Sequence, residues 1–186
     1  RQWCDEHGLL LIFDEVQTGM GRLGTLWGYE TVGVEPDILT VAKGLGNGVP
    51  IGAMLAREEV AQVFGTGAHG STFGGNALAC AAAVATVRAL LEEGVLDNAR
   101  AQGDYLGAQL RELQRTCTRV RDVRGRGLLW GVELDGPGNA VVDAARELGL
   151  IVNCTAERVI RLAPPLIVTR NEIDQAIEIL AEVLHE

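Results

Sequence analysis

Asp37-Ile38-Leu39-Thr40-Val41-Ala42-Lys43-Gly44-Leu45-Gly46-Asn47-Gly48 is the segment that decides the fold of this chain. Its apolar run ends at Lys43, the single lysine of the 186 residues, and a glycine-rich turn follows. Continuous apolar runs of this kind are typical of strands in a sheet that is covered on both faces. Residues 9–13 and 51–56 show the same pattern as residues 37–41. We therefore expect an α/β fold with a mainly parallel sheet built on these three strands.

A carboxylate follows the first apolar run as the lysine follows the second. Asp14 comes directly after Phe13, and ligands of open α/β sheets bind beyond the carboxyl ends of the strands. A primary amine forms a Schiff base with an aldehyde, and a guanidinium does not do so usefully. A pyridoxal ring would use both residues, Lys43 for its aldehyde and Asp14 for its ring nitrogen. Taken alone, Asp14 also fits a turn after a strand, and Lys43 fits a surface on which arginine has replaced lysine.

Composition excludes several classes of protein. The net charge of −9 argues against a nucleic-acid surface or an anionic membrane as partner, and no run approaches the ~20 apolar residues of a membrane span. The four cysteines lie far apart without a CxxC pair, which excludes a zinc ribbon and fits free thiols in the cytoplasm. The chain begins without an initiator methionine or a signal peptide. We expect it to be part of a longer protein.

The pattern of the chain changes near Thr116, which predicts two domains, residues 1–116 and 117–186. In the first, the long loop 65–75 precedes a helix over residues 76–91, capped by Asn76, and a second helix over residues 97–115. The second domain reads as a small α+β unit. Its expected strands and helix are residues 118–123, 128–134, 139–148 (the helix), 150–153 and 159–162. Thr169 and Glu172 form a capping box that begins the last helix.

Four blocks of this sequence resemble the signatures of the class-III, pyridoxal-phosphate-dependent aminotransferases, in order and spacing along essentially the whole chain. The blocks are residues 11–19 (LIFDEVQTG), 36–44 (PDILTVAKG), 70–76 (GSTFGGN) and 161–166 (RLAPPL). Within the class, the chain looks most like the acetylornithine aminotransferases of arginine biosynthesis. The resemblance implies a fold-type-I transferase, of which this chain would hold the later part of the large cofactor-binding domain and the small C-terminal domain.

The resemblance also implies roles for single residues around pyridoxal 5′-phosphate. Lys43 would bind the cofactor aldehyde and move the proton, and Asp14 would hold the ring nitrogen. Val16 would pack on the ring face, Gln17 would approach the ring hydroxyl, and Glu15 belongs to the same cofactor-binding block.

Three further residues take roles outside that block. Thr72 would donate to the cofactor phosphate from the neighbouring subunit of a homodimer, and Ser71 would touch the substrate at the same junction. Arg161 would bind a substrate carboxylate, since its guanidinium fork suits a dicarboxylate such as glutamate. No metal is expected.

The implied reaction is the transfer of the terminal amino group of N2-acetyl-L-ornithine to 2-oxoglutarate. Another ω-amine aminotransferase remains an alternative, acting on ornithine, succinylornithine, 4-aminobutyrate or acetyl-lysine, as does a non-catalytic fragment. A nucleotide-binding oxidoreductase is disfavoured, because the GxGxxG match at residues 19–24 lies five residues beyond the strand, after two acidic side chains. Roughly the first half of a family member is missing, so we expect the isolated chain to bind cofactor poorly and to turn over little or nothing.

Overall fold

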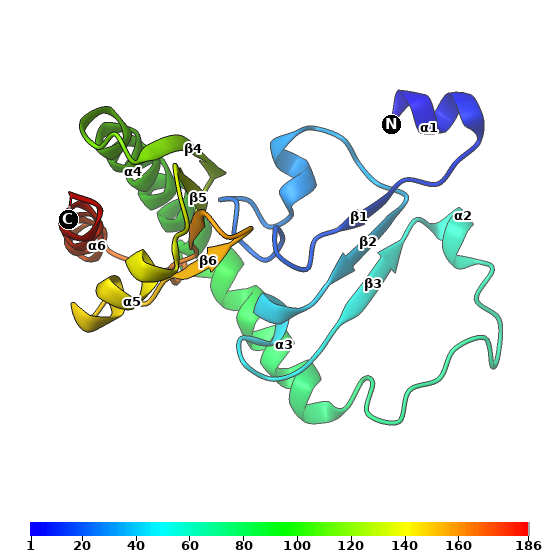
Figure 1. The fold of residues 1–186 in the computed structure, drawn as a ribbon. Coiled ribbons are helices and arrows are strands. Elements are labelled where there is room, and N and C mark those ends of the chain that lie inside the picture. The colour runs from blue at the N-terminus through cyan, green and yellow to red at the C-terminus, as the bar shows by residue number, and fades with distance from the viewer. Residues whose placement is uncertain (186) are drawn as a thin grey trace. The chain divides into compact units, whose positions relative to one another are not determined.

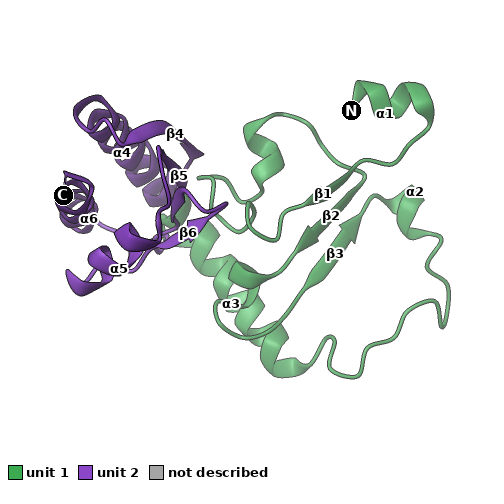
Figure 2. Cartoon of the chain, viewed as in Figure 1, with its two compact units in different colours: residues 1–96 green, residues 97–186 purple. Residues whose placement is uncertain are grey.

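We describe residues 1–185 of the chain from a computed structural model. They form two compact units, an N-terminal unit of residues 1–96 and a C-terminal unit that begins at Asp97 (Figure 2). The sequence placed the boundary about twenty residues later, after Thr116. The difference has a physical reason, because the long helix before Thr116 buries Leu106, Leu110 and Leu113 in the core of the C-terminal unit.

The N-terminal unit holds a three-stranded sheet with short helices and turns around it (Figure 1). Its elements are α1 (Gln2–His7), β1 (Ile12–Asp14), the 3-10 turn η1 (Gly28–Thr31), β2 (Ile38–Val41), the 3-10 turn η2 (Lys43–Gly46), β3 (Ala53–Ala56), α2 (Glu58–Ala61) and α3 (Ala77–Glu92). The sheet is mixed, since β1 and β2 are parallel whereas β2 and β3 are antiparallel. All three predicted strands exist, but each is shorter than its apolar run.

The expectation that this sheet is covered on both faces is wrong for the described chain. Leu39 and Val41 of the central strand are buried, but Ile12 of β1 is 57% exposed and Met54 of β3 is 48% exposed. Leu10, before β1, is 56% exposed. Apolar side chains at these positions gain little from burial here, because none of residues 1–185 covers them. The apolar runs therefore carry more hydrophobic surface than these residues bury.

The helix α3 supports the turn that follows β2. Asn76 caps its first turn as predicted, accepting a hydrogen bond from the backbone N–H of Ala79 at 2.9 Å. The helix is rich in alanine, and its small side chains allow close packing against η2 (Figure 1). The predicted loop before it is also present, running from Gln62 to Asn76 without a helix or strand.

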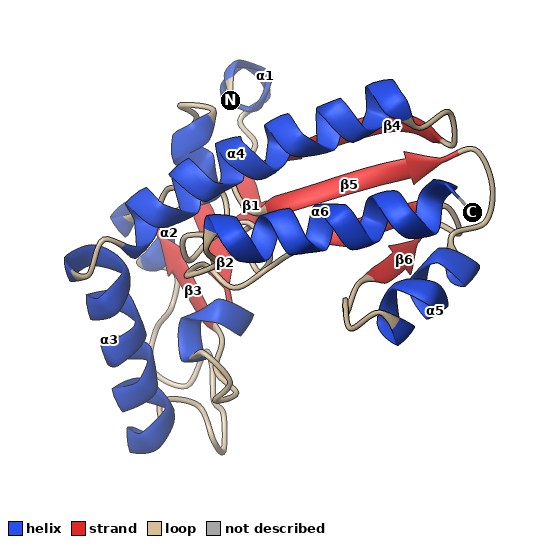
Figure 3. Ribbon diagram, turned by 90° about the vertical axis from the view of Figure 1, so that its left-hand side faces the viewer, coloured by secondary structure: helices blue, strands red, loops and turns tan. Residues whose placement is uncertain are grey.

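The C-terminal unit is an antiparallel sheet with helices against one face, as the α+β prediction requires (Figure 3). Its elements are α4 (Val95–Thr116, which begins at the end of the N-terminal unit), β4 (Val120–Arg126), β5 (Leu129–Leu134), α5 (Asn139–Glu147), β6 (Asn153–Thr155), β7 (Val159–Leu162) and α6 (Arg170–His185). The strand order is β4-β5-β7-β6. Apolar residues of β5, β7, α4 and α6 form the core of this unit, among them Leu110, Val132, Ile160 and Leu180.

Two glycines let α4 approach this sheet closely. A Cβ on Gly103 would overlap the backbone of Gly127, and a Cβ on Gly107 would overlap the ring of Trp130. Trp130 is buried, and its indole N–H donates to the carbonyl of Gly127 at 2.7 Å. The helix packs at this distance only because both positions lack a side chain. Within residues 1–185, none of the helices combines the length and the apolar composition that a membrane crossing needs.

Candidate functional site

Asp14 and Lys43 lie at the carboxyl ends of two neighbouring parallel strands. The register of β1 and β2 pairs Asp14 with Thr40, and Lys43 follows three residues later, after Ala42. Both side chains are exposed. Because the strands are parallel, both ends open at the same edge of the sheet, which is where open α/β sheets bind ligands. The structure thus places at one edge of the sheet the amine and the carboxylate that the sequence singled out.

The carboxylate of Asp14 is held by one of its two oxygens. Oδ1 accepts hydrogen bonds from the hydroxyl of Thr40 at 3.0 Å and from the backbone N–H of Val16 at 3.1 Å. Oδ2 has no hydrogen-bond partner among the residues that the structure describes. A carboxylate arranged in this way can accept one further hydrogen bond from a ligand N–H.

The backbone at Lys43 is strained and closely packed. Its φ of 46° lies in the left-handed region, which is unfavourable for a residue with a side chain. The turn is held by its neighbours, because a Cβ on Gly44 would lie 3.2 Å from the Cβ of Met20 and one on Gly46 would lie 2.8 Å from Cγ2 of Ile51. The amine of Lys43 has no ion pair or hydrogen bond within residues 1–185. A constrained backbone therefore carries an unpaired amine.

Glu15 uses its side chain within the protein. Its side chain is buried, and its carboxylate accepts hydrogen bonds from the backbone N–H groups of Gly28 at 2.5 Å and Tyr29 at 2.6 Å. The hydroxyl of Thr18 adds a third at 3.0 Å. Both oxygens are thus engaged at the start of η1. The side chain of Glu15 thus fixes the chain beyond Asp14.

The remaining predicted residues of the N-terminal unit lie in the turn after β1 and in the loop before α3. Val16 is half-buried and Gln17 is exposed in the turn. In the loop, Ser71 uses its hydroxyl locally, accepting the backbone N–H of Gly74 at 2.9 Å, and Thr72 is exposed. Among the described residues, no hydrogen bond joins Ser71 or Thr72 to the strand ends at Asp14 and Lys43.

Arg161 belongs to the C-terminal unit, on the face of its sheet that the helices do not cover. It lies in β7 between Gly131 of β5 and Asn153 of β6. Its Nε donates to Oδ1 of Asn153 at 3.2 Å. The two terminal nitrogens of the guanidinium then remain for a carboxylate, which is the bidentate geometry that arginine provides. Gly131, directly beside Arg161, adds no side chain to this part of the face.

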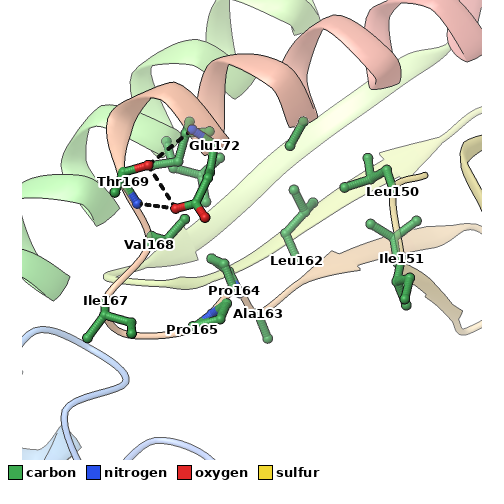
Figure 4. Close-up of a pocket in the computed structure, with 14 residues that line it drawn as sticks. Leu150, Ile151, Leu162, Ala163, Pro164, Pro165, Ile167, Val168, Thr169 and Glu172 are labelled. Carbon is green, nitrogen blue, oxygen red and sulfur yellow. Dashed lines mark hydrogen bonds between the residues drawn. The ribbon is translucent and has the colours of Figure 1, made fainter. Parts of the chain in front are cut away.

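An apolar pocket of about 500 Å³ also lies in the C-terminal unit (Figure 4). It lies between the start of α6, the segment before β6 and the segment after β7. Its walls include Leu150, Ile151 and Leu162. The only acidic side chain in its lining is Glu172, whose carboxylate accepts the backbone N–H of Thr169 at 2.7 Å in the capping box. The pocket therefore offers mainly apolar surface, and its one carboxylate already serves the helix cap.

Two residues at these sites were missed by the sequence reasoning. Thr40 is the one polar side chain in the apolar strand β2, and its place three residues before Lys43 was a usable signal. Asn153 had no such signal, because its pairing with Arg161 depends on the register of β6 and β7. Side-chain hydrogen bonds between strands depend on the register of the two strands, and a local sequence pattern does not determine that register.

Comparison with known proteins supports the same chemistry that Asp14 and Lys43 indicate at the strand ends. The sequence model of the class-III aminotransferases matches residues 1–184. The chain belongs to this family, whose members use pyridoxal phosphate.

Two curated relatives are similar to almost the whole of this chain. The chain is 51% identical over 181 residues to the acetylornithine aminotransferase of Methanothermobacter thermautotrophicus, covering 97% of this chain and 46% of that protein. It is 50% identical over 187 residues to the acetylornithine aminotransferase of Caldanaerobacter subterraneus, covering 100% of this chain and 47% of that protein. The chain therefore spans about half the length of the curated relatives it matches.

The fold is also that of solved members of the class. An ornithine aminotransferase from Toxoplasma gondii, crystallised with partial occupancy of PLP at its active site, superimposes with a TM-score of 0.93 at 39% identity. That superposition covers 98% of this chain and 44% of the Toxoplasma chain. The expected transferase fold is thereby confirmed for the part that this chain contains.

Proposed function

We propose that the protein containing this chain transfers the terminal amino group of N2-acetyl-L-ornithine to 2-oxoglutarate. The products are N-acetylglutamate 5-semialdehyde and glutamate, in arginine biosynthesis. The observation that carries the chemistry is the parallel pairing of β1 and β2, which sets Asp14 and Lys43 at one edge of the sheet. The choice of substrate rests on the relatives with 51% and 50% identity, both of which are acetylornithine aminotransferases.

The residues at this edge fit pyridoxal phosphate. Lys43 offers an unpaired amine to the aldehyde, and Oδ2 of Asp14 offers an acceptor to the ring N–H. When bound, the cofactor supplies an electron sink that stabilises the carbon from which a proton is removed. Lys43 would take that proton and return it at the next carbon. Val16 would pack on the ring face, and Gln17 would approach the ring hydroxyl.

The other proposed contacts concern the phosphate, the substrate and the partner subunit. Thr72 would donate to the cofactor phosphate of a second copy of the protein, and Ser71 would touch the substrate at the same junction, so the working form would be a homodimer. The exposed position of both residues in the loop before α3 supports this assignment. Arg161 binds a carboxylate of the dicarboxylic substrate through its two terminal nitrogens.

A specific observation favours a second candidate substrate within the same chemistry. The Toxoplasma gondii protein that shares this fold at a TM-score of 0.93 is an ornithine aminotransferase. Both substrates present a terminal primary amine, and they differ at the α-amine, which is acetylated in one and charged in the other. The side chains that line the substrate pocket therefore decide between them, and the reaction at Lys43 is the same.

The test uses protein expressed from the complete coding sequence that contains residues 1–186. Initial rates with 2-oxoglutarate are measured for acetylornithine, ornithine, succinylornithine, 4-aminobutyrate and acetyl-lysine. We expect the highest kcat/KM with acetylornithine, and a Lys43→Ala variant that loses activity with every donor. A higher kcat/KM with ornithine would replace the proposed substrate, and an active Lys43→Ala variant would overturn the chemistry.

The isolated chain of residues 1–186 provides a second arm of the test. We expect it to show weak cofactor binding and little turnover, because it spans about half of its relatives. Absorbance is followed while pyridoxal phosphate is added to this chain and to its Lys43→Ala variant. Tight binding that depends on Lys43 would contradict this expectation and would show that the described residues suffice to hold the cofactor.

A further inference from the structure

Thr40 connects the strand that leads to Lys43 with the carboxylate of Asp14. The two residues are register partners in the parallel ladder, and the hydroxyl of Thr40 donates to Oδ1 of Asp14 at 3.0 Å. The backbone carbonyl of Thr40 also accepts the N–H of Glu15 at 2.9 Å. One residue of β2 thus holds the end of β1 through both its backbone and its side chain.

The geometry of these contacts restricts how the carboxylate can turn. The hydroxyl of Thr40 and the backbone N–H of Val16 converge on the same oxygen, Oδ1, at 3.0 and 3.1 Å. Terminal torsions of aspartate side chains are broad, so a single donor would leave the carboxylate free to swing. Two donors on one oxygen fix the direction of the other. Oδ2 consequently points away from both donors, and no residue within the described part of the chain occupies it.

A protonated ring nitrogen needs one acceptor in a fixed direction. We propose, resting on the function proposed above, that Thr40 is a positioning residue that turns Oδ2 of Asp14 toward the ring nitrogen of pyridoxal phosphate. Thr40 does not touch the reacting atoms and acts only through Asp14. Without its hydroxyl, the carboxylate keeps the Val16 N–H alone and divides its time among several orientations.

Threonine also suits a strand for its shape alone, since β-branched residues are favoured there. The hydroxyl must therefore be separated from the branch. Thr40→Val keeps the shape and removes the donor, whereas Thr40→Ser keeps the donor and removes the methyl group. Thr86→Val provides a matched control in α3, because the hydroxyl of Thr86 donates to the carbonyl of Ala82 at 2.9 Å within its own helix.

The experiment reads the ring nitrogen directly. Protein from the complete coding sequence is loaded with pyridoxal phosphate labelled with ¹⁵N in the ring, and the ¹⁵N chemical shift, cofactor dissociation constant and steady-state kinetics are measured for each variant. In Thr40→Val we expect the ¹⁵N signal to move toward that of the unprotonated ring. A charge-assisted hydrogen bond of ordinary strength predicts a loss of about tenfold in kcat with KM for the amine little changed. Thr40→Ser should keep the ¹⁵N chemical shift of the unaltered protein. Thr86→Val should match the unaltered protein in the ¹⁵N shift, cofactor binding and kinetics.

Each result bears on the proposal. A ¹⁵N shift in Thr40→Val equal to that of the unaltered protein overturns the positioning role, whatever happens to activity or stability. If Thr40→Val does not fold, the comparison of Thr40→Ser with Thr40→Ala decides, because only the hydroxyl differs between them. If the unaltered protein does not bind pyridoxal phosphate, the proposed function is overturned and not the role of Thr40. A Lys43→Ala variant measured in parallel shows whether the binding that is observed depends on the proposed Schiff-base lysine.

Discussion

Glu15 holds the backbone N–H of Gly28 at 2.5 Å with the oxygen that also accepts the hydroxyl of Thr18. Its other oxygen accepts the N–H of Tyr29 at 2.6 Å. The residue next to Asp14 therefore ties the turn after β1 to the start of η1, thirteen residues further along the chain. Position 28 has no room for a side chain, since a Cβ on Gly28 would lie 2.6 Å from Oε2 of Glu15.

Replacing Glu15 should destabilise the protein and weaken cofactor binding. In Glu15→Gln the amide offers one acceptor oxygen where three donors converge, so at least one buried N–H loses its partner. A buried N–H without a hydrogen-bond partner lowers the free energy of unfolding by about 1–3 kcal/mol. We expect a lower urea midpoint for the cofactor-free protein, and a higher dissociation constant for pyridoxal phosphate, because Asp14 and Val16 are no longer held in place.

Glu35→Gln is the matched control for this change. The carboxylate of Glu35 is exposed, and within residues 1–185 its one ion pair is with Arg57, at 4.0 Å. Exposed pairs of this kind contribute little, so the urea midpoint should change by less than the equivalent of about 0.5 kcal/mol. Equal midpoints for the two variants would show that the hydrogen bonds of Glu15 do not stabilise the turn.

Asp37 gives the stability of the N-terminal unit a dependence on pH. The pKa of Asp37 lies below its ordinary value, chiefly because the backbone N–H of Leu11 donates to its carboxylate at 2.7 Å and then because Arg1 donates at 2.8 Å. A lowered carboxylate pKa stabilises the folded state above the unfolded pKa, about 3.9. That stabilisation is lost as the pH falls through the lower pKa of the folded state.

Asp37→Asn should therefore unfold more easily than the unaltered protein at pH 7, and the difference should shrink as the pH falls below about 4. Urea unfolding between pH 3 and pH 8 measures both. Asp97→Asn serves as control, because Asp97 is exposed and lies 3.5 Å from Arg100 within one helix. A difference between unaltered and Asp37→Asn protein that stayed constant over the whole pH range would contradict the assignment.

Local signals in the sequence predicted the ends of the helices well. The capping box of Thr169 and Glu172 is present in both directions, with the N–H of Glu172 donating to Oγ1 of Thr169 at 3.3 Å. The cap at Asn76 and the stop at Gly149, with φ of 91°, are also as predicted. Each of these features depends on residues at most four positions apart, so the pattern and its structural cause lie in the same short stretch.

Strand positions were less predictable, because they depend on partners far along the chain. Residues 150–153 were expected as a strand, whereas β6 begins at Asn153, where pairing with Arg161 starts. Leu150, Ile151 and Val152 instead line the apolar pocket. Leu150 and Val152 are partly buried at this pocket, whereas Ile151 is 89% exposed, so an apolar run alone does not identify a strand.

The candidate site was predictable only in part for the same reason. Lys43 and Asp14 stood out because each ends an apolar run, and the parallel pairing of those runs brings them to one edge. The contacts of Glu15 could not be predicted, since its partners are the backbone N–H groups of Gly28 and Tyr29 and not their side chains. Backbone donors are present at every residue, so no sequence pattern identifies the ones that are used.

Gly103 should tolerate no side chain, although it lies in the middle of a helix. Exchange of glycine for alanine inside an exposed helix stabilises it by about 1 kcal/mol. At Gly103 the new Cβ would overlap the backbone of Gly127, which cannot move as the end of a flexible side chain can. Overpacking costs about 1–3 kcal/mol or more. We therefore expect Gly103→Ala to lower the free energy of unfolding, opposite in sign to the helix propensity.

Ala101→Gly measures the propensity in the same helix. Ala101 is exposed two residues away, so its exchange should cost about 1 kcal/mol without any steric change. Urea unfolding of both variants decides between the two effects. A Gly103→Ala variant more stable than the unaltered protein would mean that α4 can move away from the sheet at little cost.

Asn153 should control how well Arg161 binds its carboxylate. Nε of Arg161 donates to Oδ1 of Asn153 at 3.2 Å across the β6–β7 ladder, which leaves the two terminal nitrogens in one orientation. Removing a hydrogen bond of this kind in Asn153→Ala should raise KM for 2-oxoglutarate about three- to tenfold, with kcat little changed. Arg161→Lys should raise it further, because an ammonium cannot form the bidentate pair.

The control for Asn153 is its neighbour two residues along the same strand. The hydroxyl of Thr155 donates to the carbonyl of Val159 at 3.4 Å, so Thr155→Val alters β6 without touching Arg161. The KM of Thr155→Val for 2-oxoglutarate should equal that of the unaltered protein. If Asn153→Ala also left KM unchanged while Arg161→Ala raised it, the guanidinium would orient itself without help from β6. If Arg161→Ala left KM unchanged, the carboxylate would have to bind to another cation, and the assignment of Arg161 to the substrate would be wrong.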